Sequence, residues 1–195
     1  MDDGKIGGKV LTIPNLLSLI RILLVPVFMY LYIGRDNIIA TAAVVLFSCF
    51  SDVIDGPIAR KFNQTSSLGK ALDPIGDKAT QIGLMICLVY KYPRMWIPLG
   101  IMIVKEIVCG ILGIMTIREA HLVKGAVWHG KLNTVLLFLM MGLHLLWPPR
   151  LPDTVSWISI GISSAMMLYS FAMYTARYIQ MLRAAKNKED SLDGE

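Results

Sequence analysis

The chain has 195 residues, a net charge of +5 and 55% hydrophobic residues, with a mean hydropathy of +0.58. Charged residues make up only 17% of the sequence, which is fewer than a soluble domain of this length carries. The basic residues stand at the ends of long apolar blocks and do not line one polar face. This pattern excludes a nucleic-acid-binding protein and favours a protein that crosses a membrane repeatedly.

The apolar blocks predict an all-α integral membrane fold, because an isolated strand would leave its backbone groups unpaired in lipid. We expect six transmembrane helices, at about residues 15–34, 37–58, 72–90, 95–117, 132–147 and 155–182. They would form one catalytic domain over residues 13–182. A short polar segment, residues 1–12, precedes it, and a charged tail, residues 183–195, follows it. We expect that tail to fray, because it is poor in apolar residues.

Basic residues gather mainly on one side of the predicted helices. That side holds both termini and the segments around Arg60, Lys70 and Lys124, whereas the opposite side holds only Arg35, Lys91, Arg94 and Arg150. The positive-inside rule therefore places both termini in the cytoplasm, in a multi-pass protein of the cytoplasmic membrane. Anionic membrane lipids and phosphate-bearing substrates are the expected partners, and nucleic acid is not.

The first predicted helix carries a polar stripe along an otherwise apolar block. Asn15, Ser18 and Arg21 recur there at three-residue intervals. Arg21 lies too deep in the block for simple exposure to solvent. The stripe is either a packing seam or the edge of a polar cavity, and we favour the cavity.

Four aspartates stand at the neighbouring ends of the second and third predicted helices. Asp52 and Asp55 are three residues apart, and Asp73 and Asp77 are four apart, so each pair shares one helix face. Ionised carboxylates beside a hydrocarbon layer are costly, and four together repel one another unless cations compensate them. We therefore expect an active site in a polar cavity on the cytoplasmic side, with Mg²⁺ or Mn²⁺ bound, two ions per site.

Small and basic residues extend both carboxylate pairs along the same helix faces. Gly56, Ala59 and Arg60 continue the stripe of the first pair, and Gly69 precedes the second pair by one turn. The small residues leave a shallow gap for a flat or bulky group, and Arg60 suits a phosphate. The metal ions would bridge diphosphate oxygens, and one aspartate could accept a proton from an acceptor hydroxyl. Helix capping and ion pairing alone would not explain four carboxylates in register with two glycines.

The segment has the form D-x2-D-G-x2-A-R-x8-G-x3-D-x3-D and resembles the signature of the CDP-alcohol phosphotransferase (CDP-alcohol phosphatidyltransferase) family. The resemblance implies an enzyme, usually a homodimer, that displaces CMP from a CDP-linked lipid with an alcohol acceptor. It implies that Asp52, Asp55 and Asp73 hold the metal ions and that Asp77 ligates metal or acts as the base, which makes Asp73 and Asp77 the expected catalytic residues. The residues expected to seat the cytidine diphosphate are Asp52, Gly56, Ala59, Arg60 and Gly69.

Weaker signals concern the acceptor. The segments IPNLLSLIR and LGKALDPIGDK resemble the glycerolipid branch of the family, which contains phosphatidylglycerophosphate synthases and cardiolipin synthases. The former usually carry Arg-Glu in the fourth helix, an arginine eight residues later, and Gly-Lys-x-Lys-Thr at the start of the fifth. This chain has Lys105, Gly113 and Asn133 at the cationic positions of those patterns. Contacts to the dianionic phosphate of glycerol 3-phosphate are therefore weakened or lost.

The Lys-x-Asn-Thr pattern is similar to that of the cardiolipin synthases, so we favour phosphatidylglycerol as the acceptor and CDP-diacylglycerol as the donor, with glycerol 3-phosphate as the alternative acceptor. Lys105 and Glu106 could form a purely structural ion pair, but neighbouring residues on a helix point about 100° apart, so we favour partners elsewhere for both. For Arg118 and Lys131, plain positive-inside charge is an alternative to acceptor binding. The candidate acceptor contacts are Lys105, Arg118, His129, Lys131 and Arg21.

A polytopic transporter is the main alternative to an enzyme. Its intramembrane acids and Lys105 could form an ion pathway. The sequence shows no internal repeat and no pair of broken helices, which favours the enzyme.

Overall fold

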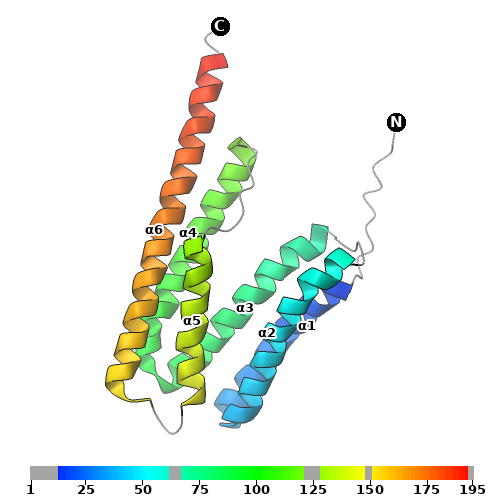
Figure 1. Cartoon of the computed structure of the whole chain (residues 1–195), viewed down its shortest axis with the longest axis vertical. Helices are drawn as coiled ribbons and strands as arrows, with labels where there is room; N and C mark the ends of the chain where they lie inside the picture. The colour runs from blue at the N-terminus through cyan, green and yellow to red at the C-terminus, as the bar shows by residue number, and fades with distance from the viewer. Residues whose placement is uncertain (1–12, 62–66, 121–127, 148–150, 193–195) are drawn as a thin grey trace. The chain divides into compact units, whose positions relative to one another are not determined.

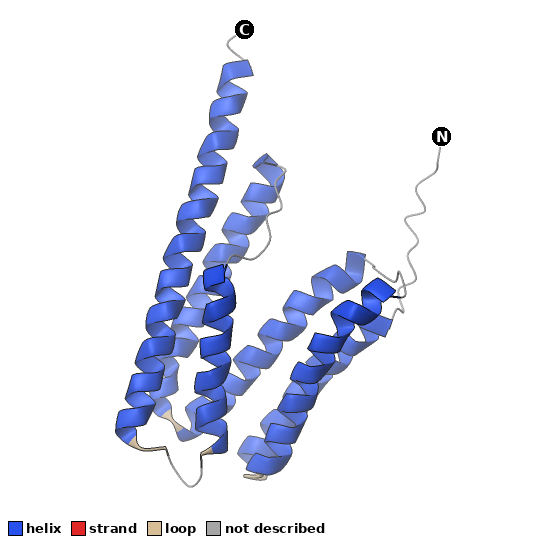
Figure 2. Ribbon diagram, viewed as in Figure 1, coloured by secondary structure: helices blue, strands red, loops and turns tan. Residues whose placement is uncertain are grey.

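The computed structural model describes residues 13–61, 67–120, 128–147 and 151–192, and within these the side chains of residues 16–51, 74–116, 128–147 and 151–185. Helices account for nearly all of the described backbone, and no strand occurs in it (Figure 2). The all-α class predicted from the apolar blocks is therefore confirmed.

The chain divides into two compact units, of which the first is Met1–Pro93. In this unit α1 packs against both α2 and α3 (Figure 1). Phe28 and Tyr32 from the first helical segment are buried, together with Leu84 and Leu88 of α3. The elements are α1 (Ile13–Met29), its π-helical extension η1 (Tyr30–Gly34), α2 (Ile38–Lys61) and α3 (Ser67–Lys91).

Helices α1 and α3 pack closely at Gly83. A Cβ atom built on Gly83 would lie 2.6 Å from Cγ1 of Val25 and 3.1 Å from Cζ of Phe28. No real side chain fits at these distances, so the absence of a Cβ at Gly83 allows the two helices to pack this closely.

The second unit is Arg94–Glu195, and in it α6 packs against both α4 and α5 (Figure 1). Its buried core contains Met102 of α4, Met141 of α5, and Ile160 and Met167 of α6. The elements are the short helix η2 (Pro93–Met95), α4 (Trp96–Ala120), α5 (Trp128–Leu146) and α6 (Asp153–Leu192).

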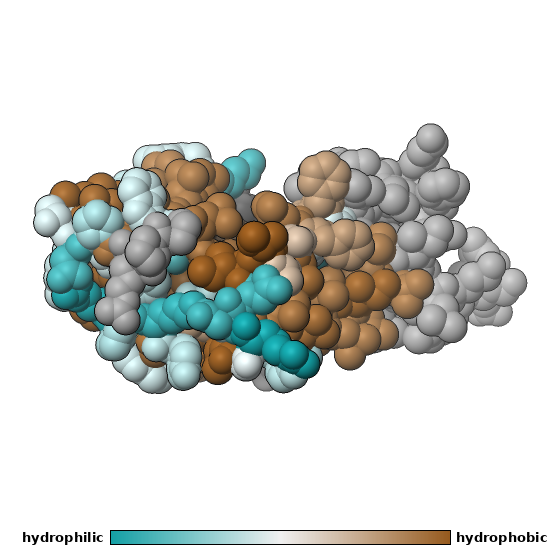
Figure 3. Space-filling view, turned by 90° about the horizontal axis from the view of Figure 1, so that it is seen from below, coloured by the Kyte–Doolittle hydropathy of each residue, from teal (hydrophilic) through white to brown (hydrophobic). Residues whose placement is uncertain are grey.

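Among the described residues, four segments are long and apolar enough to cross a membrane: Leu16–Gly34, Pro93–Thr116, Trp128–Leu146 and Asp153–Ala185. The apolar part of α2, Ile38–Ser51, is shorter. Apolar residues, drawn in brown, cover much of the described part of the face seen in Figure 3. Large apolar side chains such as Phe50 and Leu139 are exposed. Such a surface is typical of helices that face lipid. The count of six crossings is a prediction that these features do not decide.

The helix boundaries differ most from the predicted spans at the start of α3 and at the end of α6. Helix α3 begins at Ser67, ahead of the expected start at residue 72. Helix α6 continues to Leu192, well beyond the predicted end of the last span at residue 182. The predicted N-terminal segment, residues 1–12, lies outside the described residues.

Candidate functional site

The eight motif residues lie on the two helices predicted to carry them. Helix α2 extends through Lys61 and so contains the first carboxylate pair and the small residues that follow it, and α3 starts two residues before Gly69 and contains the second pair. Each aspartate pair is thus separated by about one helical turn, as the sequence predicted. Of these eight side chains the structure describes only Asp77; those of Asp52, Asp55, Gly56, Ala59, Arg60, Gly69 and Asp73 lie outside the described residues.

Asp77 forms an ion pair with Arg21 of α1. Its Oδ1 accepts a hydrogen bond of 2.7 Å from Nη1 of Arg21. The Arg21 side chain is buried, at 2% exposure, whereas the Asp77 side chain is 40% exposed. Two residues of the polar stripe, Ser18 and Arg21, therefore lie on the side of α1 that faces α3, and Ser18 is fully buried.

The carboxylates of the motif suit hard divalent cations, because Mg²⁺ and Mn²⁺ prefer oxygen ligands. Two helices that each carry a pair of aspartates one turn apart can supply such ligands from two sides. Within the described residues, no three His, Cys, Asp or Glu side chains come together as a metal site. This does not test the predicted four-aspartate site, because three of its side chains lie outside the described residues.

The predicted acceptor contacts lie in the second unit, apart from Arg21. Nζ of Lys105 donates a hydrogen bond of 2.8 Å to Oε1 of the neighbouring Glu106. The expectation that these two residues pair with partners elsewhere is therefore wrong for Lys105: both side chains are long enough to bend across the 100° between them. The Lys105 side chain is 11% exposed, so its charge is partly buried and balanced by Glu106.

Two tyrosines of α6 lie against two glycines on the neighbouring helices. The rings of Tyr174 and Tyr178 stack with their centroids 6.3 Å apart. The Tyr174 hydroxyl would be 2.3 Å from a Cβ built on Gly130 of α5, and the Tyr178 hydroxyl 3.7 Å from one built on Gly113 of α4. The position where the related synthases carry a second arginine is thus next to a tyrosine hydroxyl. Sequence patterns did not reveal this stack, because it depends on helix packing.

The remaining predicted contacts differ in exposure. His129 is buried, with its ring 4.8 Å from that of Tyr174 and its Nδ1 3.4 Å from Oγ of Ser170. This environment favours a packing role for His129. The side chain of Lys131, in contrast, is exposed. Asn133 is buried, and its Oδ1 has no hydrogen-bond partner in the described structure. The side chain of Arg118 lies outside the described residues.

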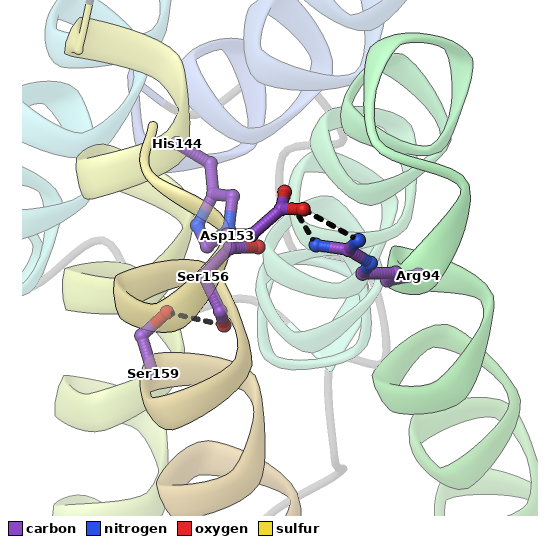
Figure 4. A network of polar contacts seen from close by, with 5 residues as sticks. All are labelled: Arg94, His144, Asp153, Ser156 and Ser159. Carbon is purple, nitrogen blue, oxygen red and sulfur yellow. Dashed lines mark hydrogen bonds and ion pairs between the residues drawn. The ribbon is translucent and has the colours of Figure 1, made fainter. Parts of the chain in front are cut away.

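A polar network that the sequence did not predict joins the short helix η2, which precedes α4, to the start of α6 (Figure 4). Arg94 donates two hydrogen bonds, of 2.7 Å and 3.1 Å, to the two carboxylate oxygens of Asp153. The guanidinium carbon of Arg94 also lies 4.9 Å from the ring centroid of Trp157. Beside this pair, Nε2 of the buried His144 lies 2.9 Å from Oγ of Ser156. These contacts connect η2, α5 and α6 within the second unit.

Comparison with known proteins identifies the family. Residues 11–179, which make up most of the chain, match the family described as CDP-alcohol phosphatidyltransferase. The chain belongs to the CDP-alcohol phosphatidyltransferase family. The match includes the aspartate motif and both units. The family resemblance drawn from the motif is therefore confirmed.

Proteins similar to this phosphatidyltransferase include members of both expected groups. A protein of Streptomyces coelicolor named cardiolipin synthase (CMP-forming) is 29% identical over 90% of the chain and 86% of its own length. Two proteins are named CDP-diacylglycerol–glycerol-3-phosphate 3-phosphatidyltransferase. The one from Aquifex aeolicus is 27% identical over 88% of the chain and 98% of its own length. The one from Haemophilus influenzae is 33% identical over 89% and 93%.

The chain is accordingly an enzyme of the phosphatidyltransferase class, from the glycerolipid branch. Its family and its long apolar helices make it a multi-pass membrane protein of phospholipid biosynthesis. The transporter alternative is thereby excluded.

Proposed function

We propose that this phosphatidyltransferase makes cardiolipin: it transfers the phosphatidyl group of CDP-diacylglycerol to phosphatidylglycerol and releases CMP. The observation that carries this choice of acceptor is the pairing of Lys105 with Glu106 at 2.8 Å. An arginine at this position could bond the neighbouring glutamate and still offer a fork of N–H donors to a dianionic phosphate. The single ammonium group of Lys105 is already bonded to Glu106 and has no such fork, so it is a weaker site for a small dianionic phosphate.

The neighbouring positions support the same acceptor. Gly113 has no side chain with which to bind phosphate and lies beside Tyr178, and Asn133 is neutral and buried. Glycerol 3-phosphate relies on charge-assisted contacts for its binding. Phosphatidylglycerol carries a singly charged phosphodiester, and burial of its acyl chains supplies further binding. A site with reduced positive charge therefore favours phosphatidylglycerol.

In the proposed mechanism, the chain's own residues hold and orient the two substrates. A hydroxyl oxygen of phosphatidylglycerol bonds to the phosphorus that carries diacylglycerol, the bond from this phosphorus to CMP breaks, and Asp77 or Asp73 takes the hydroxyl proton. Gly56, Ala59 and Gly69 leave room for the cytidine diphosphate, and Arg60 pairs with its phosphates. When bound, two Mg²⁺ or Mn²⁺ ions would stabilise the charge on the departing phosphate; their proposed ligands are Asp52, Asp55, Asp73 and Asp77.

The proposal includes six membrane crossings, with both termini and the aspartate motif in the cytoplasm, and a homodimer. The excess of Lys and Arg near the termini and the motif supports this orientation. Single cysteines introduced into a chain whose Cys49, Cys87 and Cys109 are replaced would test it. Cysteines at positions 5 and 188 should react with an impermeant maleimide only in inverted vesicles.

Glycerol 3-phosphate is the second candidate acceptor, because the relatives from Aquifex aeolicus and Haemophilus influenzae carry the name of that activity. The purified enzyme can be given CDP-diacylglycerol with each acceptor separately, in the presence of Mg²⁺ or Mn²⁺ and in the presence of EDTA. We expect CMP and cardiolipin with phosphatidylglycerol, and neither product in EDTA. Phosphatidylglycerophosphate as the main product would establish the second candidate. Full activity in EDTA would overturn the metal site.

A further inference from the structure

Arg21 is a buried cation in an apolar helix. It lies within the candidate membrane span Leu16–Gly34, and its side chain is 2% exposed. A buried charge in such a segment is costly and is retained where it has a partner and a task. The hydrogen bond of 2.7 Å to Oδ1 of Asp77 supplies the partner.

The surface of α3 is shaped to receive this guanidinium group. Gly76 precedes Asp77, and a Cβ built on it would lie 3.5 Å from Cδ and 3.6 Å from Nη1 of Arg21. The Arg21 side chain therefore lies directly against the α3 backbone at this point. One turn further along, the buried Thr80 hydroxyl donates a hydrogen bond of 3.0 Å to the Gly76 carbonyl.

The two partners of the ion pair differ in exposure, and this difference separates the possible roles of Arg21. At 2% exposure the guanidinium group cannot receive an acceptor phosphate without leaving Asp77. The carboxylate, at 40% exposure, remains accessible while Arg21 restrains it from the buried side. An ion pair that only stabilised the fold would not need its carboxylate to be exposed at the active-site motif.

We propose that Arg21 is a positioning residue: it holds the Asp77 carboxylate in its working orientation and does not contact the acceptor. This inference rests on the proposed place of Asp77 in the active site. It replaces the prediction from the sequence that Arg21 binds the acceptor. A carboxylate that loses a charge-assisted hydrogen bond can rotate, and misplacement of a reacting group lowers the rate of the chemical step.

Steady-state kinetics of Arg21→Met, Arg21→Lys and Asp77→Asn test the proposal. We expect Arg21→Met to lower kcat by about ten- to a hundredfold and to leave the KM for phosphatidylglycerol within about twofold. Arg21→Lys should restore part of kcat, because it keeps a charge but not the planar fork. A raised acceptor KM with unchanged kcat would make Arg21 an acceptor contact and overturn the proposal.

A matched control separates positioning from folding. Phe28→Leu alters a fully buried residue of α1 that also faces α3, and should lower thermal stability without changing kcat. If Arg21→Met lowers kcat no more than Phe28→Leu does, the role of Arg21 is structural only and the proposal fails.

The double variant Arg21→Met/Asp77→Asn shows whether Arg21 acts through Asp77. Its kcat should equal that of Asp77→Asn, and in metal-free protein the two substitutions should lower Tm by less than the sum of their separate effects. Additive effects would refute the inference. Full activity of Asp77→Asn would instead refute the proposed role of Asp77, so the two failures are distinguishable.

Discussion

The close approach of α1 and α3 makes a quantitative prediction for Gly83→Ala. The added Cβ would lie 2.6 Å from Val25 Cγ1 and 3.1 Å from Phe28 Cζ, and Phe28 is fully buried. Overpacking of this kind costs about 1–3 kcal/mol, whereas exchange of glycine for alanine inside a helix contributes about 0.8–1 kcal/mol in the opposite direction.

Gly76→Ala is the matched control, because it lies on the same helix and faces the same partner. Its added Cβ would meet Arg21 and Ser18 at 3.5–3.6 Å, which is ordinary van der Waals contact. Both variants gain the same helix propensity, so their difference isolates the overpacking and should be about 1–3 kcal/mol. For a chain of this size that corresponds to a Tm difference of roughly 2–12 °C.

Thermal unfolding in detergent micelles measures this difference. We expect Gly83→Ala to unfold at the lower temperature, and Val25→Ala in the same chain to restore part of the loss, because it removes Cγ1. Equal Tm values for Gly83→Ala and Gly76→Ala would refute the packing of α1 on α3 described here.

Three further predictions concern the second unit. Gly130→Ala should destabilise by about 1–3 kcal/mol, since its Cβ would lie 2.3 Å from the Tyr174 hydroxyl, and Tyr174→Phe should recover part of the loss in thermal unfolding. Arg94→Ala and Asp153→Ala should each lower Tm slightly, with no further loss in the double variant and a smaller effect at high salt, because the pair is exposed. Glu106→Gln should raise kcat/KM for glycerol 3-phosphate relative to phosphatidylglycerol by up to about tenfold, because Lys105 is no longer balanced; an unchanged ratio would count against Lys105 as an acceptor contact.

Helix positions followed from the sequence wherever apolar residues form long blocks. The start of α3 did not. The segment from Ser67 to Ala71 contains Gly69 and Lys70 and does not belong to the apolar block that was used to place this helix, although it is helical. The far end of α6 was missed for a related reason. Its last residues include Ala, Lys and Glu, which are strong helix formers, so the helix continues beyond the apolar block that was used to place its end.

The aspartate motif could be recognised from the sequence because it depends only on the types of its residues and their spacing. The pairing of Asp77 with Arg21 could not, since the two residues are 56 positions apart and meet only because α1 packs on α3. The same holds for the Tyr174 and Tyr178 stack against two glycines. For Lys105 and Glu106, helix geometry predicted that adjacent residues do not pair. Their side chains are long enough to form a hydrogen bond nevertheless.

Direct competition between the two acceptors tests the central claim. Enzyme in vesicles that contain CDP-diacylglycerol and Mg²⁺ is given phosphatidylglycerol and glycerol 3-phosphate together, each with a different label, and the two labelled products are quantified at early times. The reduced positive charge at Lys105, Gly113 and Asn133 predicts that cardiolipin predominates. A predominance of phosphatidylglycerophosphate would contradict the proposed acceptor.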